Sequence, residues 1–353
     1  MRFCPIDQLQ PSMRLARPLY AETGQVLLSA GVELTPTYIT RLKRVGIPGL
    51  YIGESETEDL VIPEVISEKT RQQAVGSIRD AFKSIQVGRT FDVAAVSQPV
   101  NSIIDEISRN PNVALNLTEI RTYDGYTFGH SVNVCVLSVI MGLRSGLNEL
   151  NLKELAMGAI LHDVGKTEIP EQIITKPGGL SDEEMQEVRK HPSYGFDILR
   201  QNKSLSLAAC HVAFQHHERP NGKGYPRGLQ GDQVSFLGRI AGVADAYDAM
   251  TSERVYRPGM APAEALRVVR QLTNIQFDPK AAALLLDTVT PYPVGTLVRL
   301  NNYEVGVVID TNHRDTYRPV VRVLYQADGR KLPAPAEVDL AKEQYLKVAE
   351  VLT

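Results

Sequence analysis

Five of the seven histidines in this chain form one ordered series, and most of them stand in or beside apolar segments with helical spacing. A buried imidazole or carboxylate needs a partner. Neutral imidazoles and carboxylates are ligands that first-row transition metals accept. The series therefore predicts helices that converge on a centre able to hold two metal ions. With two aspartates, its members are His130, His162, Asp163, His191, His216, His217 and Asp245.

The pair His162 and Asp163 follows an apolar segment whose members recur at helical spacing, from Leu152 to Ile160. We expect a largely buried helix to carry both side chains into the interior. Lys166 comes four residues after His162, so we place it one turn along the same helix, where its ammonium could meet a phosphate oxygen. A lysine that only marks the helix end is the alternative.

The other histidines stand in similar surroundings. The segment after His130 is apolar nearly all round and predicts a central helix. His216 and His217 end another apolar stretch. Adjacent residues diverge by about 100° on a helix, so one ion can take both only near a helix end or a bend. Gly222 and Gly224, just after the pair, permit that bend.

Longer motifs surround these residues in a fixed order. The triplet Gly224-Tyr225-Pro226 lies in HHERPNGKGYP, between HPSYG and RIAGVADAYDAMTSERVYRP, and QFDP follows at 276–279. Together with His162-Asp163, these motifs resemble the HD-GYP branch of the HD phosphohydrolase superfamily. The resemblance extends from about residue 120 to about residue 285, nearly half of the chain.

Members of this family hydrolyse bis-(3′,5′)-cyclic dimeric GMP (cyclic di-GMP), a bacterial second messenger. The resemblance implies a metal-dependent phosphodiesterase that opens this molecule to pGpG by attack of a metal-bridging hydroxide; whether it continues to GMP stays open. Asp163 would bridge the two ions. The remaining ligands would divide into one group of His130, His162 and Asp245 and another of His191, His216 and His217.

The resemblance also assigns three residues to the substrate. Lys166 would face the scissile phosphate, and Arg254 would grip phosphate oxygens with its guanidinium. Tyr225 would contact the ligand, although a Gly-Tyr-Pro turn that only anchors a loop is an equal alternative. Asp248 and Arg257 are taken as structural.

The number and identity of the metals follow partly from one departure. Some family members hold a third metal with a glutamate at the position of Tyr126, and a phenol with a pKa of about 10 is a poor replacement. Glu119 and Asp124 lie off the required helical spacing. We therefore expect two divalent ions, with iron or manganese favoured and nickel, cobalt or zinc also compatible.

Two other functions stay open. The chain could be a cyclic di-GMP receptor or signalling scaffold with little turnover, or an HD hydrolase for another cyclic dinucleotide. A homodimer, and a protein partner bound through the N-terminal module or the Gly-Tyr-Pro loop, are further expectations.

Composition and the absence of long apolar runs argue against several classes of function. The formal charge of −3 and the scattered basic residues do not favour a nucleic-acid polymer as partner. No apolar run approaches the roughly 18 residues of a membrane span, and the start, MRFCPIDQLQP, lacks a signal-peptide core. Cys4, Cys135 and Cys210 are far apart and are expected to be reduced, which favours the cytoplasm.

The fold expected is mainly α: an HD-superfamily helical bundle with a small α+β N-terminal module and a small β-rich C-terminal appendage. The predicted divisions are a regulatory module at 1–60, a linker with connecting helices at 61–118, the HD-GYP catalytic domain at 119–288 and the appendage at 289–353.

Local signals add detail to the N-terminal module. Thr23-Gly24 predicts a hairpin turn. Thr35 and Pro36 begin a helix that Gly46 ends, before a short strand at 49–52.

A helix after the acidic segment 54–59 has one apolar face, which either packs on the catalytic domain or forms a short dimer seam. This face consists of Ala74, Ile78, Ala81, Phe82 and Ile85.

Signals also punctuate the rest of the chain. Ser181 and Glu184 form a capping box expected to orient the helix bearing His191. Residues 295–325 predict three short strands, with turns at Asn301-Asn302 and around 312–315. His211 and His313 are expected to lie outside the metal series.

Overall fold

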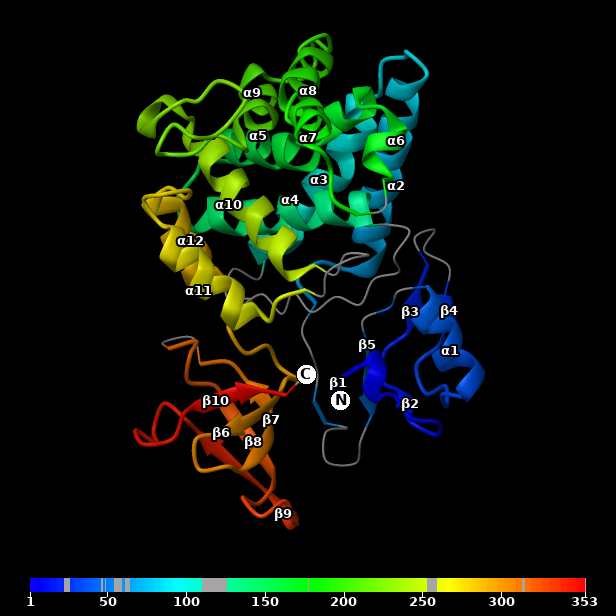
Figure 1. Cartoon of the computed structure of the whole chain (residues 1–353), viewed down its shortest axis with the longest axis vertical. Helices are drawn as coiled ribbons and strands as arrows, with labels where there is room; N and C mark the ends of the chain where they lie inside the picture. Colours follow the sequence, from blue (N-terminus) through cyan, green and yellow to red (C-terminus); the bar gives the residue numbers. More distant parts are fainter. Residues whose placement is uncertain are drawn as a thin grey trace.

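Figure 1 shows a helical domain at one end of the molecule, with two small β-containing modules next to each other at the other end. The fold expected from the sequence, a helical bundle between an α+β N-terminal module and a β-rich C-terminal region, is confirmed. The computed structural model describes residues 1–21, 26–45, 47, 49–53, 59–60, 64–109, 126–176, 178–252, 259–312 and 315–352, without the side chains of Tyr126 and Thr127.

The described part of the N-terminal module contains a three-stranded antiparallel sheet, a two-stranded pair, a short 3-10 helix and an α-helix of nine residues. Its elements are β1 (Arg2–Pro5), η1 (Ile6–Gln8), β2 (Arg14–Leu15), β3 (Leu19–Tyr20), β4 (Val26–Leu28), α1 (Pro36–Arg44) and β5 (Gly49–Gly53). The sheet order is β1-β5-β2, and β3 pairs with β4. Thr35 caps α1 as predicted, because its hydroxyl accepts a hydrogen bond from the backbone N–H of Tyr38 at 3.2 Å. Thr23, Gly24 and Gly46 lie outside the described residues.

The helical domain is built around α4, whose middle is buried on every side, as the apolar sequence predicted. It contacts α2, α3, α5, α10 and α12. The helices are α2 (Glu68–Gln86), α3 (Val93–Arg109), α4 (Tyr126–Arg144), α5 (Glu149–Ile160), η4 (Val164–Glu168), α6 (Glu171–Ile174), α7 (Asp182–Val188), α8 (His191–Leu199), α9 (Leu207–Gln215), η5 (Gly231–Gln233), α10 (Phe236–Thr251), α11 (Pro262–Leu272) and α12 (Pro279–Thr288). Among the described helices, none is long and apolar enough to cross a membrane.

The apolar face of α2 packs inside the chain. Its five members are buried in the same core as α4, and Phe82 meets Phe128 of α4 edge to face, with ring centroids 5.4 Å apart. Of the two alternatives left by the sequence, packing within the chain on the helical domain is therefore the one observed. These side chains are not available for a dimer seam.

The C-terminal region is one antiparallel sheet of five strands, in the order β10-β6-β7-β8-β9. The strands are β6 (Leu297–Leu300), β7 (Val305–Asp310), β8 (Val320–Tyr325), β9 (Lys331–Asp339) and β10 (Val348–Val351). The three predicted strands correspond to β6, β7 and β8, and the sequence did not predict the other two.

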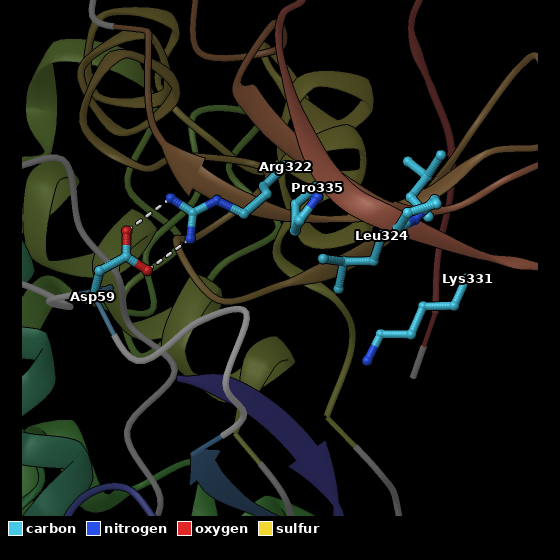
Figure 2. A pocket seen from close by; sticks show the side chains of 7 residues that line it. Asp59, Arg322, Leu324, Lys331 and Pro335 are labelled. Carbon is cyan, nitrogen blue, oxygen red and sulfur yellow. Dashed lines mark hydrogen bonds and ion pairs between the residues drawn. The ribbon is translucent and has the colours of Figure 1, made fainter.

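Polar contacts help to attach this sheet to the rest of the described chain. Arg322 holds Asp59, the last residue of the acidic segment 54–59, through two hydrogen bonds of 2.6 and 2.8 Å, beside a pocket that Leu324 and Lys331 also line (Figure 2). In the N-terminal module, the backbone N–H of Phe3 donates to the carbonyl of Gly295 at 3.2 Å. The C-terminal region is thus tied to both Asp59 and the first strand.

Candidate metal centre

The His-Asp pair lies in a tight turn that follows α5. His162 and Asp163 come after the last residue of α5, and the backbone N–H of Lys166 donates to the carbonyl of Asp163 at 2.9 Å, an i to i+3 bond. Gly165 lets this turn pack closely against α8, because a Cβ there would overlap the backbone carbonyl oxygen of His191. The prediction that Lys166 continues the helix of His162 is therefore wrong: it lies on η4, which packs against α8.

His191 also begins a helix of its own. The capping box of Ser181 and Glu184 is present, but the helix that it starts, α7, ends at Val188. His191 opens α8, with Pro192 in its first turn. A proline ring cannot continue a preceding helix and suits the first turn of a new one. The prediction that the capped helix carries His191 is therefore wrong.

The remaining ligand candidates come from three helices. His130 lies one turn inside α4, and Asp245 lies in the middle of α10. His216 is the C-cap of α9 and His217 follows it, so the helix end lets both adjacent imidazoles turn to one side. Their ring centroids are 4.1 Å apart.

All seven side chains of the series converge on one centre. Their candidate ligand atoms fall into three overlapping groups, each with its atoms within 4.8 Å of one another: His130, His162 and Asp245; His191, His216 and His217; and His162, Asp163 and His216. The carboxylate of Asp163 lies between the imidazoles, with Oδ2 3.3 Å from His162 Nε2 and Oδ1 3.4 Å from His191 Nε2. The side chains of His217 and Asp245 are the more exposed members, at 27% and 13%.

Hydrogen bonds orient three of these imidazoles in the same way. Nδ1 of His162, His191 and His216 each lies 2.7 Å from the backbone carbonyl oxygen three residues earlier. A carbonyl oxygen only accepts, so each Nδ1 carries the proton and each Nε2 presents a lone pair. Such outer hydrogen bonds accompany metal-ligating histidines.

The Nε2 lone pairs of these imidazoles face one another without a donor between them in the described part of the site. Nε2 of His191 lies 3.3 Å from Nε2 of His216, so two acceptors face each other in a buried site. Nε2 of His162 is buried without a hydrogen-bond partner among the described residues. An acceptor left unpaired in the interior is costly. The residues present therefore fit a metal ion, which would satisfy all three nitrogen atoms.

Burial keeps the group of His191, His216 and His217 uncharged. It lowers the pKa of His191 to about 3 and that of His217 to about 4, and holds the pKa of His216 well below its ordinary value. The imidazoles are therefore neutral at pH 7, the form that binds a metal.

The two site aspartates are ionised. Burial raises the pKa of Asp163, but His162 and Lys166 outweigh it and hold that pKa well below the usual range. The same opposition, with His130 the main partner, holds the pKa of Asp245 down.

His130 is held between acidic groups. Burial lowers its pKa, yet hydrogen bonds with Asp245 and Asp248 outweigh burial and raise the pKa to about 9. Its Nε2 lies 3.1 Å from Asp245 Oδ1. A divalent cation can take the place of the proton on that nitrogen, because it also neutralises the carboxylate.

Two of the three predicted substrate residues border the ligands. Lys166 Nζ donates to Asp163 Oδ2 at 2.5 Å, and its side chain is about a third exposed, at 32%. The ring of Tyr225 stacks on His217 with centroids 4.6 Å apart, and the guanidinium of Arg189 lies 5.7 Å from the tyrosine ring centroid. Burial raises the pKa of Tyr225. Arg254 lies outside the described residues, as does the side chain of Tyr126.

Sequence reasoning missed one residue that shapes the site. Glu218 is buried and accepts hydrogen bonds from the backbone N–H groups of Arg227 at 2.8 Å and Leu229 at 2.9 Å. It thereby folds the loop that carries Tyr225 back toward the His216-His217 pair. The available signal was an acidic residue directly after an apolar helix, where burial requires partners.

A second residue was assigned only a structural part. Asp248 is buried, and its Oδ2 lies 2.7 Å from Nδ1 of His130. Its position three residues after Asp245 places both carboxylates on one face of α10. His211, by contrast, packs against Phe196 and lies outside the three ligand groups, as predicted, whereas His313 is not among the described residues.

The fold and this site define a class. A family model described as an HD domain matches residues 102–281, and the chain belongs to the HD domain family. The resemblance to its HD-GYP branch is confirmed. A second family model, described as a KOW domain associated with the HD domain, matches residues 297–353.

Particular proteins are similar to this chain. Cyclic di-GMP phosphodiesterase PA4108 of Pseudomonas aeruginosa is 37% identical over 266 residues, which cover 75% of this chain and 64% of that protein. The 3′3′-cGAMP-specific phosphodiesterase 3 of Vibrio cholerae is 35% identical over 160 residues, 45% of this chain and 35% of that protein. The chain thus spans less than two thirds of either relative.

A solved structure shares the fold. That of Bd1817, an HDG"Y"P protein from Bdellovibrio bacteriovorus, is 18% identical with a TM-score of 0.54, and covers 81% of this chain and 98% of that one.

Proposed function

We propose that this chain is a metal-dependent phosphodiesterase that hydrolyses cyclic di-GMP to pGpG. The observation that carries the proposal is the pair of opposed Nε2 atoms of His191 and His216, 3.3 Å apart beside the Asp163 carboxylate. Bare imidazole nitrogens and a shared carboxylate are the donor set of a dinuclear metal centre. The name of the Pseudomonas relative supports the choice of substrate.

Two divalent ions would be held by the two His-rich groups, with Asp163 facing both. His130, His162 and Asp245 would hold one ion, and His191, His216 and His217 the other. Iron or manganese is favoured, while nickel, cobalt and zinc also suit these ligands. When bound, such ions polarise phosphate oxygens and lower the pKa of water toward neutrality.

The residues around the ligands suit an anionic phosphodiester. Lys166, partly exposed beside Asp163, would pair with an oxygen of the scissile phosphate, and Arg254 would bind phosphate oxygens in the same way. Tyr225 would flank the substrate from its place on His217. In the reaction, a water oxygen bonds to phosphorus, the P–O3′ bond breaks and the 3′ oxygen takes up a proton. Hydrolysis of the remaining phosphodiester would give GMP.

Turnover of cyclic di-GMP, followed by chromatography on anaerobically purified protein, tests the proposal. Wild type is expected to form pGpG. Asp163→Asn is expected to form no pGpG, because a neutral amide cannot replace the carboxylate that faces both metal positions. Asp197→Asn on the exposed surface is the matched control and should retain activity. Full activity of Asp163→Asn would contradict the assigned role.

A second candidate substrate is another cyclic dinucleotide, which the name of the Vibrio relative supports. A panel of cyclic di-GMP, 3′3′-cGAMP and cyclic di-AMP separates the two, since the preferred substrate has the highest kcat/KM. Binding of cyclic di-GMP without product, by metal-loaded protein, would instead favour a receptor. A cytoplasmic location, a homodimer and a protein partner stay predictions, as do the domain boundaries drawn from the sequence.

A further inference from the structure

Asp248 is a buried carboxylate with several partners. It is 2% exposed and accepts hydrogen bonds from Nδ1 of His130 at 2.7 Å and from the hydroxyl of Ser252 at 3.0 Å, both at Oδ2. An ionised carboxylate only accepts, so it holds the proton of His130 on Nδ1 and directs Nε2 to the metal centre.

The other oxygen of Asp248 extends the contact along α4 to α2. Asn133 donates from Nδ2 to Asp248 Oδ1 at 2.6 Å, and its own Oδ1 accepts from Nη1 of Arg71 at 3.3 Å. Asn133 is 4% exposed and lies one turn after His130, on the same face of α4. A continuous chain of hydrogen bonds therefore joins Arg71 to His130.

Arg71 lies in the first turn of α2, where the chain arrives from the N-terminal module. Ser67 caps this helix, and Glu106 of α3 accepts from its backbone N–H at 2.5 Å and from its hydroxyl at 2.9 Å. Three residues earlier, Glu64 pairs with Arg17 of the N-terminal module at 3.2 Å. A displacement at this junction would reach Arg71 before any other part of the network.

We propose that Asp248 is a positioning residue for His130, and that Asn133 and Arg71 couple the first turn of α2 to it. The coupling gives the N-terminal module a physical route to the affinity of the metal centre. This inference rests on the proposed metal centre. It adds that the first turn of α2 controls the metal affinity of that centre. Energetic coupling of this kind travels through packed side chains and hydrogen bonds with alternative arrangements.

Titration of the metal-free, full-length protein with Mn²⁺ tests the coupling. Asp248→Asn leaves one acceptor oxygen where His130, Ser252 and Asn133 all donate, so we expect Mn²⁺ affinity to fall about 10- to 100-fold. Arg71→Met keeps the apolar stem but removes the guanidinium, and we expect a fall of about 2- to 30-fold. Arg71→Lys, which keeps a donor, should recover part of the loss.

The control is Arg79→Met, which removes a guanidinium from the same helix two turns further on and should leave the affinity unchanged. Thermal unfolding of each metal-free variant identifies a merely structural effect, which would lower Tm without changing Mn²⁺ affinity. Wild-type affinity in Arg71→Met, or an equal loss in Arg79→Met, would overturn the coupling. The measured quantity is metal affinity, not activity. A lack of cyclic dinucleotide turnover would therefore overturn the proposed function, while the Mn²⁺ affinities of the variants would still test the coupling.

Discussion

Replacing Gly165 with alanine tests how much the close packing of η4 on α8 contributes to the stability of the domain that carries the metal centre. A Cβ at this position would overlap the carbonyl oxygen of His191 and the amide nitrogen of Gly195, and both are backbone atoms that cannot swing aside. Overpacking costs about 1 to 3 kcal/mol, and a backbone clash belongs at the upper end. For a domain of this size, about 3 kcal/mol corresponds to a fall in Tm of roughly 6 to 12 °C.

Circular dichroism of the metal-free protein measures this fall. The matched control is Gly76→Ala inside α2, where a Cβ would meet nothing within 4 Å. That change should stabilise the helix by about 0.5 to 1 kcal/mol, because alanine loses less backbone entropy than glycine. A Gly165→Ala protein that melts at the wild-type temperature would refute the packing argument.

Three further predictions concern carboxylates that hold loops or helix ends. Burial raises the pKa of Glu106, but hydrogen bonds from Thr70 and Ser67 outweigh burial and hold the pKa below its ordinary value of 4.5. The ionised Glu106 therefore stabilises the folded protein fully above pH 4.5, and this stabilisation is lost as the pH falls through the lowered pKa. Urea unfolding of Glu106→Gln should therefore show a loss of about 1 to 2 kcal/mol at pH 7 that narrows in acid; a loss independent of pH would contradict this. Asp59→Asn should speed hydrogen exchange of the backbone amides at residues 59–60, which Arg322 holds through Asp59, with a smaller difference at high salt. An unchanged exchange rate would show that the ion pair does not restrain this segment. Glu218→Ala should speed hydrogen exchange of the two loop amides that donate to Glu218, those of Arg227 and Leu229; protected amides in that variant would mean that other contacts hold the loop.

The ligands of the site could be predicted because their signal is local. Few histidines are present, and the pairs His162-Asp163 and His216-His217 follow apolar helical segments that carry them inward. The resemblance supplied the remaining members and their order. The local backbone was harder, because the turn after His162 depends on contact between Gly165 and α8, which no sequence period reveals.

Residues that act through long-range contacts could not be predicted. Asp248 meets His130 across 118 positions of the sequence, and Asn133 meets Arg71 across 62. Neither pair shares a motif or a helical spacing. Their parts follow only from the packing of α2, α4 and α10.

Strand β9 shows a different limit of prediction from sequence. Pro333 and Pro335 argue against a strand, because proline donates no hydrogen bond to a sheet. They are tolerated because β9 is an edge strand, paired only with β8 among the described strands. Whether a strand lies at an edge is a property of the assembled sheet, so the sequence alone did not reveal it.

The central claim is that the converging histidines and aspartates form a dinuclear metal centre on which turnover depends. The most direct measurement counts metals per chain by elemental analysis of anaerobically purified protein and follows cyclic di-GMP hydrolysis on the same sample through chelation and reloading. We expect about two ions per chain, loss of pGpG formation when they are removed, and recovery on addition of Fe²⁺ or Mn²⁺. Full turnover by protein from which the metals have been removed would contradict the account.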